Sequence, residues 1–273
     1  MSAHADELQR WIRAFGLDPM WRPLVHTTLA WIASAAPPWA SESDRALACM
    51  DLGTCFFVLD DSPPDDALAR YSDLERILGG APVDPGRPLQ RAYAALFPRL
   101  GADDHYRASR RTFVAALRVR HAMRAGELRL DAAGYLALRE TTIYFACWLS
   151  TWELLGGFAL SAAERAVVQP AFVPANRWQV LENARVSLAR DARSGTPNVI
   201  AMVAAERGVS LATADTNVAA RAADDLHAYR AAAAAIRARP HATAIARYLD
   251  LVDHGVAGAM RHHADPARYH ERA

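Results

Sequence analysis

The sequence predicts an all-α fold, and three observations support this. Signals for β-strands are nearly absent: no Asn-Gly or Asp-Gly turn separates alternating apolar runs, and β-branched clusters are few. Alanine, leucine and arginine dominate and recur at helical spacing. Glycines and prolines stand where the periodic segments end. The expected helices are residues 4–15, 23–35, 42–61, 65–79, 87–98, 104–125, 131–156, 161–168, 172–193, 197–207, 210–238 and 241–263.

The gaps between these segments carry residues that end helices. Proline removes a backbone donor and restricts the residue before it, and glycine favours the turn that follows a helix. No linker is rich in glycine and serine, and no shift in composition marks a boundary, so we expect one all-helical domain over residues 1–273. The expected breaks are Pro37-Pro38, Pro63-Pro64, Gly79-Gly80 to Pro88, Gly126, Gly156-Gly157, Pro170, Gly195-Thr196-Pro197, Gly208 and Pro240.

Composition excludes several classes of function. The 273 residues carry 31 basic and 30 acidic side chains, a net charge of +1, so charge does not favour binding to nucleic acid. Every basic residue is arginine, which excludes a phosphate-loop lysine and a Schiff base. Three cysteines without metal-ligand spacing fit buried thiols in a reducing compartment. The charged start of the chain lacks the apolar run of a signal peptide, so we expect a cytoplasmic protein.

One long apolar stretch, residues 141–160, contains a single charge, Glu153. Its length would allow a membrane span. A carboxylate at mid-bilayer is costly, however, and Gly156-Gly157 interrupts the run. We therefore expect a buried core helix and no membrane span.

An acidic cluster follows the apolar run CFFVL. Four carboxylates lie within seven residues: Asp60, Asp61, Asp65 and Asp66. Crowded carboxylates repel one another unless a cation neutralises them, and an all-oxygen ligand set suits Mg²⁺. The alternative is a solvated loop that caps the next helix, with Asp65 and Asp66 in its first turn.

A second polar strip lies on the helix expected at residues 172–193. Asn183, Ser187 and Asp191 are spaced four residues apart, which places them within about 80° on one helix face. An amide, a hydroxyl and a carboxylate so arranged are three oxygen ligands for a divalent cation, and Arg190 adjoins them for an anion held by that metal. The alternative for this strip is a solvated helix face.

Together the two motifs resemble those of the bacterial class I terpene synthases, over roughly residues 42–270. That family holds three Mg²⁺ around a prenyl diphosphate with a DDxx(x)D/E motif and an N-D-x-x-S-x-x-x-E motif. Here Asp60, Asp61 and Asp65 match the first motif, and Asn183, Ser187 and Asp191 match the second. The segment SGTPNVIAMVAAERGVSLATA resembles the family's continuation of the second motif. Arg139, 44 residues before Asn183, resembles its diphosphate-sensing arginine, and Arg268-Tyr269 its C-terminal pair.

The resemblance implies a single helical bundle of the isoprenoid synthase type around a central apolar cavity. Asp60, Asp61, Arg139, Arg268 and Tyr269 would act in catalysis. The arginines at 139, 190 and 268, with Tyr269, would contact diphosphate as it leaves. A carbocation needs aromatic faces and exclusion of water, for which the candidates are Phe56, Phe57, Phe145, Trp148 and Trp152.

This chain departs from the family pattern at three places. Asp191 stands for the usual glutamate, Ala184 for an aspartate, and Ile143 for a glycine four residues after the sensor arginine. The proline pair inside the first motif leaves Asp65 and Asp66 as alternative ligands.

The implied function is that of a Mg²⁺-dependent terpene cyclase, with Mn²⁺ as an alternative metal. It would ionise a linear prenyl diphosphate, farnesyl diphosphate first, and release diphosphate. The alternatives are a diterpene synthase for geranylgeranyl or copalyl-type diphosphate, a trans-prenyltransferase, and a non-catalytic helical interaction protein. A second DDxxD motif, expected of chain-elongating enzymes, is missing from the sequence. We expect a monomer or a homodimer.

Overall fold

The structure is a computed structural model that describes residues 2–21 and 25–264. Every regular element in those two ranges is helical, which confirms the all-α prediction. The chain separates into two compact units, each with its own packing. The first comprises Met1–His121 and Ala146–Phe158, and the second Ala122–Phe145 and Ala159–Ala273. That residues 1–273 form one domain stays a prediction.

The first unit holds the N-terminal helices. Within it, α4 packs against α1, α3 and α7, and α6 packs against α7. Its core is built from side chains such as Leu8, Ile32, Leu74, Phe97 and Leu117, all fully buried. Its elements are α1 (Ala3–Phe15), α2 (Asp18–Trp21), α3 (Val25–Ala35), α4 (Glu42–Leu52), a π-helical turn (Gly53–Phe57), α5 (Val58–Asp60), α6 (Pro64–Leu78), α7 (Pro88–Leu100), most of α8 (Asp104–Arg124) and α10 (Phe145–Leu155).

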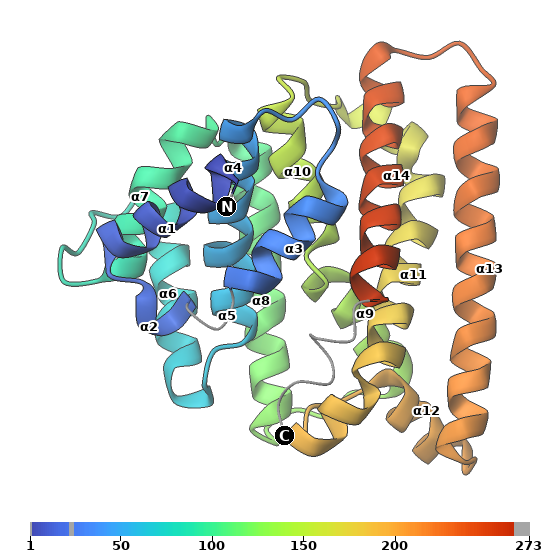
Figure 1. The fold of residues 1–273 in the computed structure, drawn as a ribbon. Coiled ribbons are helices and arrows are strands. Elements are labelled where there is room, and N and C mark those ends of the chain that lie inside the picture. Colours follow the sequence, from blue (N-terminus) through green and yellow to red (C-terminus); the bar gives the residue numbers. More distant parts are fainter. Residues whose placement is uncertain (1, 22–24, 265–273) are drawn as a thin grey trace. The chain divides into compact units, whose positions relative to one another are not determined.

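The second unit is built around one long helix, α11 (Ala162–Ser194). The helices α13 (Leu211–Arg237) and α14 (Thr243–His263) lie beside it (Figure 1). Two shorter helices, α9 (Ala132–Thr142) and α12 (Val199–Arg207), pack against α11 and against each other. The unit therefore places α9 and the start of α12 next to the C-terminal half of the long helix, where the second polar strip lies.

Local sequence explains how the long helices begin. Ser41 and Asp44 form a reciprocal capping box at the start of α4, and Ser161 and Glu164 form another at α11. In each, the serine hydroxyl accepts from the third backbone N–H while the carboxylate accepts from the N-cap backbone N–H. Such caps satisfy donors that have no partner inside the helix.

The expected break at Pro170 is wrong, because α11 continues through both Pro170 and Pro174. An interior proline costs about 3 kcal/mol through a lost hydrogen bond and a steric clash. The helix face around these prolines is buried through Val168, Ala171 and Ala175, and α11 packs along both α13 and α14. Tertiary packing therefore outweighs the local preference and keeps the helix continuous.

The single helix expected over residues 131–156 is also wrong, because it is divided into α9 and α10. At the break, Tyr144 has a φ of 69°, a positive value that is uncommon for a residue other than glycine. This left-handed conformation costs an L-residue roughly 1–2 kcal/mol. The side chain is only 1% exposed, and burial of a large apolar group offsets a cost of that size. Sequence patterning did not reveal this break.

Most of α10 is buried, as expected for residues 141–160, and Glu153 is 2% exposed. Over the described ranges, none of the helices combines the length and apolar character that a membrane span requires.

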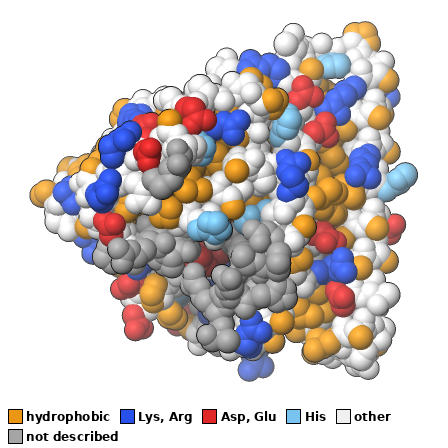
Figure 2. Space-filling view, viewed as in Figure 1, with side chains coloured by type: hydrophobic (Ala, Val, Ile, Leu, Met, Phe, Trp, Pro, Cys, Tyr) orange, Lys and Arg blue, Asp and Glu red, His pale blue; other side chains and the backbone are white. Residues whose placement is uncertain are grey.

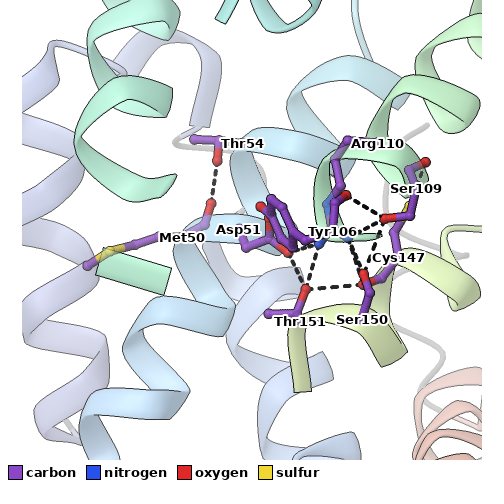
Figure 3. A network of polar contacts seen from close by, with 9 residues as sticks. All are labelled: Met50, Asp51, Thr54, Tyr106, Ser109, Arg110, Cys147, Ser150 and Thr151. Carbon is purple, nitrogen blue, oxygen red and sulfur yellow. Dashed lines mark hydrogen bonds and ion pairs between the residues drawn. The ribbon is translucent and has the colours of Figure 1, made fainter. Parts of the chain in front are cut away.

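A polar network crosses the core of the first unit (Figure 3). Arg110, which is 0% exposed, donates from Nη2 to Asp51 Oδ2 over 2.5 Å and to Thr151 Oγ1 over 2.6 Å. Its Nη1 donates to Ser150 Oγ and to the Cys147 carbonyl, and Tyr106 donates its hydroxyl to Asp51. The network joins α4, α8 and α10 immediately before the π-helical turn that leads to the acidic cluster. A buried charge pair needs such additional hydrogen bonds to offset its desolvation.

Charges on the visible surface are mixed in sign. Figure 2 shows arginine side chains interspersed with carboxylates on the face in view. The mixture of signs fits the net charge of +1.

Candidate active site

The second polar strip lies on three successive turns of α11. Ser187 and Asp191 are only 1% and 7% exposed, and Asn183 is half-buried. The alternative of a solvated helix face is therefore wrong for two of the three residues. Buried oxygens at this spacing need partners within the protein or a ligand.

Asp191 is held by three neighbours. Its Oδ2 accepts from Ser187 Oγ over 2.6 Å and from Asn198 Nδ2 over 2.9 Å. Its Oδ1 accepts from Arg190 Nη2 over 3.2 Å. Asn198 also donates to the Ala184 carbonyl over 2.9 Å, which fixes the start of α12 against α11. These contacts orient the carboxylate and offset its charge while it is buried.

Arg139 joins the strip from α9. Its Nη2 donates to Asn183 Oδ1 over 3.1 Å, and its Nη1 donates to Thr142 Oγ1 over 3.1 Å. Thr142 is the last residue of α9, directly before the break at Ile143 and Tyr144. The structure thus brings together, inside the second unit, five of the residues predicted for the site: Arg139, Asn183, Ser187, Arg190 and Asp191.

The acidic cluster lies in the first unit, spread over two helices. Asp60 is the last residue of α5, Asp61 follows it and is exposed, and Asp65 and Asp66 stand in the first turn of α6. Asp66 pairs with Arg70 over 2.9 Å, one helical turn onward. The second half of the cluster therefore lies where carboxylates complement the N-terminus of a helix. Neither Asp65 nor Asp66 is singled out as a ligand by these positions.

Asp60 has a partner that sequence reasoning missed. Arg120 on α8 places Nη1 2.5 Å from Asp60 Oδ1, and its Nη2 donates to the Asp60 carbonyl over 3.0 Å. The Arg120 side chain is 4% exposed, and that of Asp60 is 19% exposed. The two residues are 60 positions apart, and Arg120 lies in a helix with six arginines, so no pattern in the sequence distinguished it. Asn198, which holds Asp191, lies in the segment that resembles the continuation of the second motif, but no role was predicted for it from the sequence.

The predicted aromatic residues are placed in packed clusters. Trp148 and Trp152 meet edge to face at 5.2 Å, with Trp31 and Trp39 at either end of the row. Phe57 is fully buried beside the half-buried Phe56. In the second unit, Phe145 stacks on Phe172 at 6.0 Å.

Phe145 also packs against the backbone of Gly255, where an added Cβ would lie 2.5 Å from the ring. Core packing accounts for this ring, and whether any of the five rings contacts a substrate stays a prediction.

Two predicted residues, Arg268 and Tyr269, lie outside the described residues. Among the described residues, no three histidine, cysteine or acidic side chains converge into a closed metal site. The donors at both motifs are all oxygens, which is the chemistry that Mg²⁺ prefers. Mg²⁺ keeps several waters and takes only one or two carboxylates, so the donor set at each motif fits it.

The chain matches the family model described as terpene synthase family 2, C-terminal metal binding, over residues 51–228, more than half its length. No match was found among curated proteins. Linalool/nerolidol synthase from Streptomyces clavuligerus is similar in structure, with a TM-score of 0.81 and 20% identity over 94% of this chain and 93% of that one. Germacradien-4-ol synthase from Streptomyces citricolor gives 0.76 and 25% identity over 95% and 92%.

A third similar structure is 2-methylisoborneol synthase from Streptomyces coelicolor A3(2), in complex with Mg²⁺ and geranyl-S-thiolodiphosphate. It gives a TM-score of 0.82 and 17% identity over 98% of this chain and 93% of that one. These likenesses confirm the class I terpene synthase fold that the two motifs implied, and they agree with the family match. The chain therefore belongs to terpene synthase family 2 and is a terpene synthase.

Proposed function

We propose that this enzyme ionises a linear prenyl diphosphate in the presence of Mg²⁺ and cyclises the resulting carbocation, with farnesyl diphosphate as the first choice of substrate. The observation that carries the proposal is the oxygen strip Asn183, Ser187 and Asp191, in which the last two residues are buried and Arg139 is hydrogen-bonded to the first. Hard oxygen ligands beside a guanidinium are suited to a metal–diphosphate group. Mn²⁺ is the alternative metal.

When bound, Mg²⁺ neutralises the diphosphate charge as the carbon–oxygen bond breaks. Asn183, Ser187 and Asp191 are the proposed ligands in the second unit, and Asp60 and Asp61, with Asp65 or Asp66, those in the first. Ser187 and Asn198 hold the Asp191 carboxylate in one orientation before the metal arrives. Such preorganisation avoids rearrangement during the reaction.

The arginines would donate hydrogen bonds to the diphosphate leaving group. Arg139 and Arg190 present guanidinium groups at the strip, and Arg268 and Tyr269 would add donors from the C-terminal segment. Arginine stays charged at all relevant pH values and grips phosphate with two parallel hydrogen bonds. As negative charge grows on the departing diphosphate, these hydrogen bonds strengthen, which lowers the barrier to ionisation.

The carbocation that remains needs a dry apolar environment. The proposed lining residues are Phe56, Phe57, Phe145, Trp148 and Trp152, whose ring faces attract a cation without acting as nucleophiles. Product identity depends on which of these faces contacts each intermediate.

The test is incubation of the purified protein with MgCl₂ and each of geranyl, farnesyl, geranylgeranyl and copalyl diphosphate. Geranyl diphosphate is included because two similar structures hold geranyl analogues. Release of diphosphate is measured together with hydrocarbons and alcohols in headspace and extract. Farnesyl diphosphate should give the highest turnover and a cyclic C15 product, abolished by EDTA.

The other outcomes separate the alternatives. Highest turnover with a C20 diphosphate would make the protein a diterpene synthase. Diphosphate release that requires isopentenyl diphosphate would make it a prenyltransferase. No release with any substrate in MgCl₂ or MnCl₂ would overturn the proposed function.

A further inference from the structure

The Asp60–Arg120 pair gives the first metal motif an internal cation. One guanidinium contacts Asp60 twice, at the carboxylate through Nη1 and at the backbone carbonyl through Nη2. This double contact fixes both the side chain and the end of α5. Because arginine does not lose its proton, a positive charge is permanently present at this carboxylate.

The contact is made on one side of the carboxylate. The Oδ1 atom that faces Arg120 is buried, although the Asp60 side chain as a whole is 19% exposed. The accessible part of the side chain therefore lies away from Oδ1. A cation approaching from solvent would reach Asp60 while Arg120 still holds the buried oxygen.

Two cations on one carboxylate repel each other. A bound Mg²⁺ would carry two positive charges close to the Arg120 guanidinium, and this pair is only partly exposed, so solvent screens the repulsion weakly. A diphosphate anion supplies enough negative charge to offset both cations. Mg²⁺ should therefore bind poorly at Asp60 without the anion and well with it.

We propose that Arg120 is a positioning residue that couples metal binding at Asp60 to the arrival of diphosphate. The inference rests on the proposed function, since it assumes that Asp60 is a Mg²⁺ ligand. Thermodynamic linkage makes this coupling reciprocal. If diphosphate raises the affinity for Mg²⁺, then Mg²⁺ raises the affinity for diphosphate by the same factor. An enzyme so built would not load metal without substrate.

The test measures binding without turnover. The midpoint of thermal unfolding is followed across MgCl₂ concentration, with and without inorganic diphosphate, for the wild type, Arg120→Gln and Arg120→Lys. In the wild type, diphosphate should sharply lower the MgCl₂ concentration needed for half of the shift. In Arg120→Gln, MgCl₂ alone should act at about tenfold lower concentration, an effect equivalent to about 1.4 kcal/mol. Arg120→Lys, which keeps the charge, should resemble the wild type.

Arg118→Gln is the matched control. It lies on the same helix and grips Glu75 through two hydrogen bonds of 2.9 and 2.6 Å, away from the acidic cluster. This variant should leave the MgCl₂ dependence unchanged. If Arg120→Gln fails to fold, Arg120→Met removes the charge without burying a new polar side chain, although the Asp60 carboxylate loses its cation in either variant.

The outcomes are distinguishable. An unchanged dependence on diphosphate in the uncharged Arg120 variants, beside normal coupling in the wild type, would overturn this inference and leave the proposed function standing. Wild-type protein that responds to neither MgCl₂ nor MgCl₂ with diphosphate would count against the proposed metal sites themselves. A loss of coupling in Arg120→Lys equal to that in Arg120→Gln would show that the contact is structural and would also overturn it.

Discussion

Arg139 on α9 and Asn183 on α11 are joined by a hydrogen bond of 3.1 Å from Nη2 to Oδ1, although 44 residues separate them in the chain. The bond links the arginine expected to contact diphosphate with the first residue of the strip expected to hold metal. Both residues lie in the same compact unit, so the packing of that unit alone brings them together.

Replacing Arg139 by lysine should lower kcat by about 10- to 100-fold. Lysine carries the same charge but cannot offer two parallel donors to a phosphate group. Steady-state kinetics with the best prenyl diphosphate would measure the loss. Arg185→Gln is the control, because Arg185 lies on α11 near Asn183 but pairs with Glu182 and Asp215. Equal kcat in Arg139→Lys and the wild type would remove Arg139 from the site.

Ser187→Ala and Asn183→Ala should each raise the MgCl₂ concentration needed for half-maximal turnover. Ser187→Ala also removes the 2.6 Å hydrogen bond that orients Asp191, so its effect should be the larger of the two. Activity titrated against MgCl₂ is the measurement. Asp191→Glu should retain activity, because glutamate is the usual residue at this position in the family. A dead Asp191→Glu beside a fully active Asn183→Ala would contradict the assignment.

Asp60→Asn and Asp61→Asn should each lower turnover by about 100-fold or more, since each replaces a charged ligand by a neutral one. Asp66→Asn should have a small effect, because Asp66 is exposed and pairs with Arg70 within the helix. Circular dichroism should show the same helical signal for the three variants and the wild type. If Asp66→Asn were as damaging as Asp60→Asn, the later carboxylate would have to be counted among the ligands.

Breaking the buried pair of Asp51 and Arg110 should unfold the protein more easily. Arg110→Met leaves the Asp51 carboxylate buried without its charged partner, which costs about 3–5 kcal/mol in the free energy of unfolding. The double variant Asp51→Leu with Arg110→Met should lose less than Arg110→Met alone. Urea denaturation gives the values. Arg99→Met, which removes a partly exposed pair with Glu7, should cost less than about 1 kcal/mol.

The three cysteines should resist thiol reagents in the folded protein. Burial raises the pKa of the Cys147 thiol to about 11, and burial also raises the pKa values of Cys49 and Cys55. At pH 8 only about one Cys147 in a thousand would be a thiolate, the reactive form, and that fraction grows as the pH rises towards 11. Titration with Ellman's reagent at pH 8 should detect almost no thiol before denaturation and three afterwards. Rapid reaction of one thiol in the native protein would show that its burial is incomplete.

Much of the fold could be read from local sequence. The periodic spacing of apolar residues predicted helices that start at residues 42 and 161, because this signal acts over one or two helical turns. The structure shows Ser41 and Ser161 capping the helices that begin there. The break predicted at Pro170 is wrong because a proline indicates only the local cost of a lost hydrogen bond. The continuity of α11 depends instead on its contacts with α13 and α14. The break at Tyr144 has no signal in the neighbouring sequence. The burial of this side chain, which depends on the folded structure, offsets the strain of its positive φ.

The features of the candidate site also separate into those that the local sequence predicts and those that depend on the packing of the helices. The sequence by itself determined the ligand chemistry, since Asn183, Ser187 and Asp191 share a face of any helix that contains them, and Asp60 and Asp61 follow an apolar helix whatever packs around it. Only the tertiary structure decided which side chains contact those ligands: Arg120 at Asp60, Arg139 at Asn183, and the neutral amide of Asn198 at Asp191. The positions of these partners in the chain are set by helix packing, which has no fixed period. The family resemblance singled out Arg139, but Arg120 could not be distinguished among the 31 arginines until the helices of the first unit were placed together.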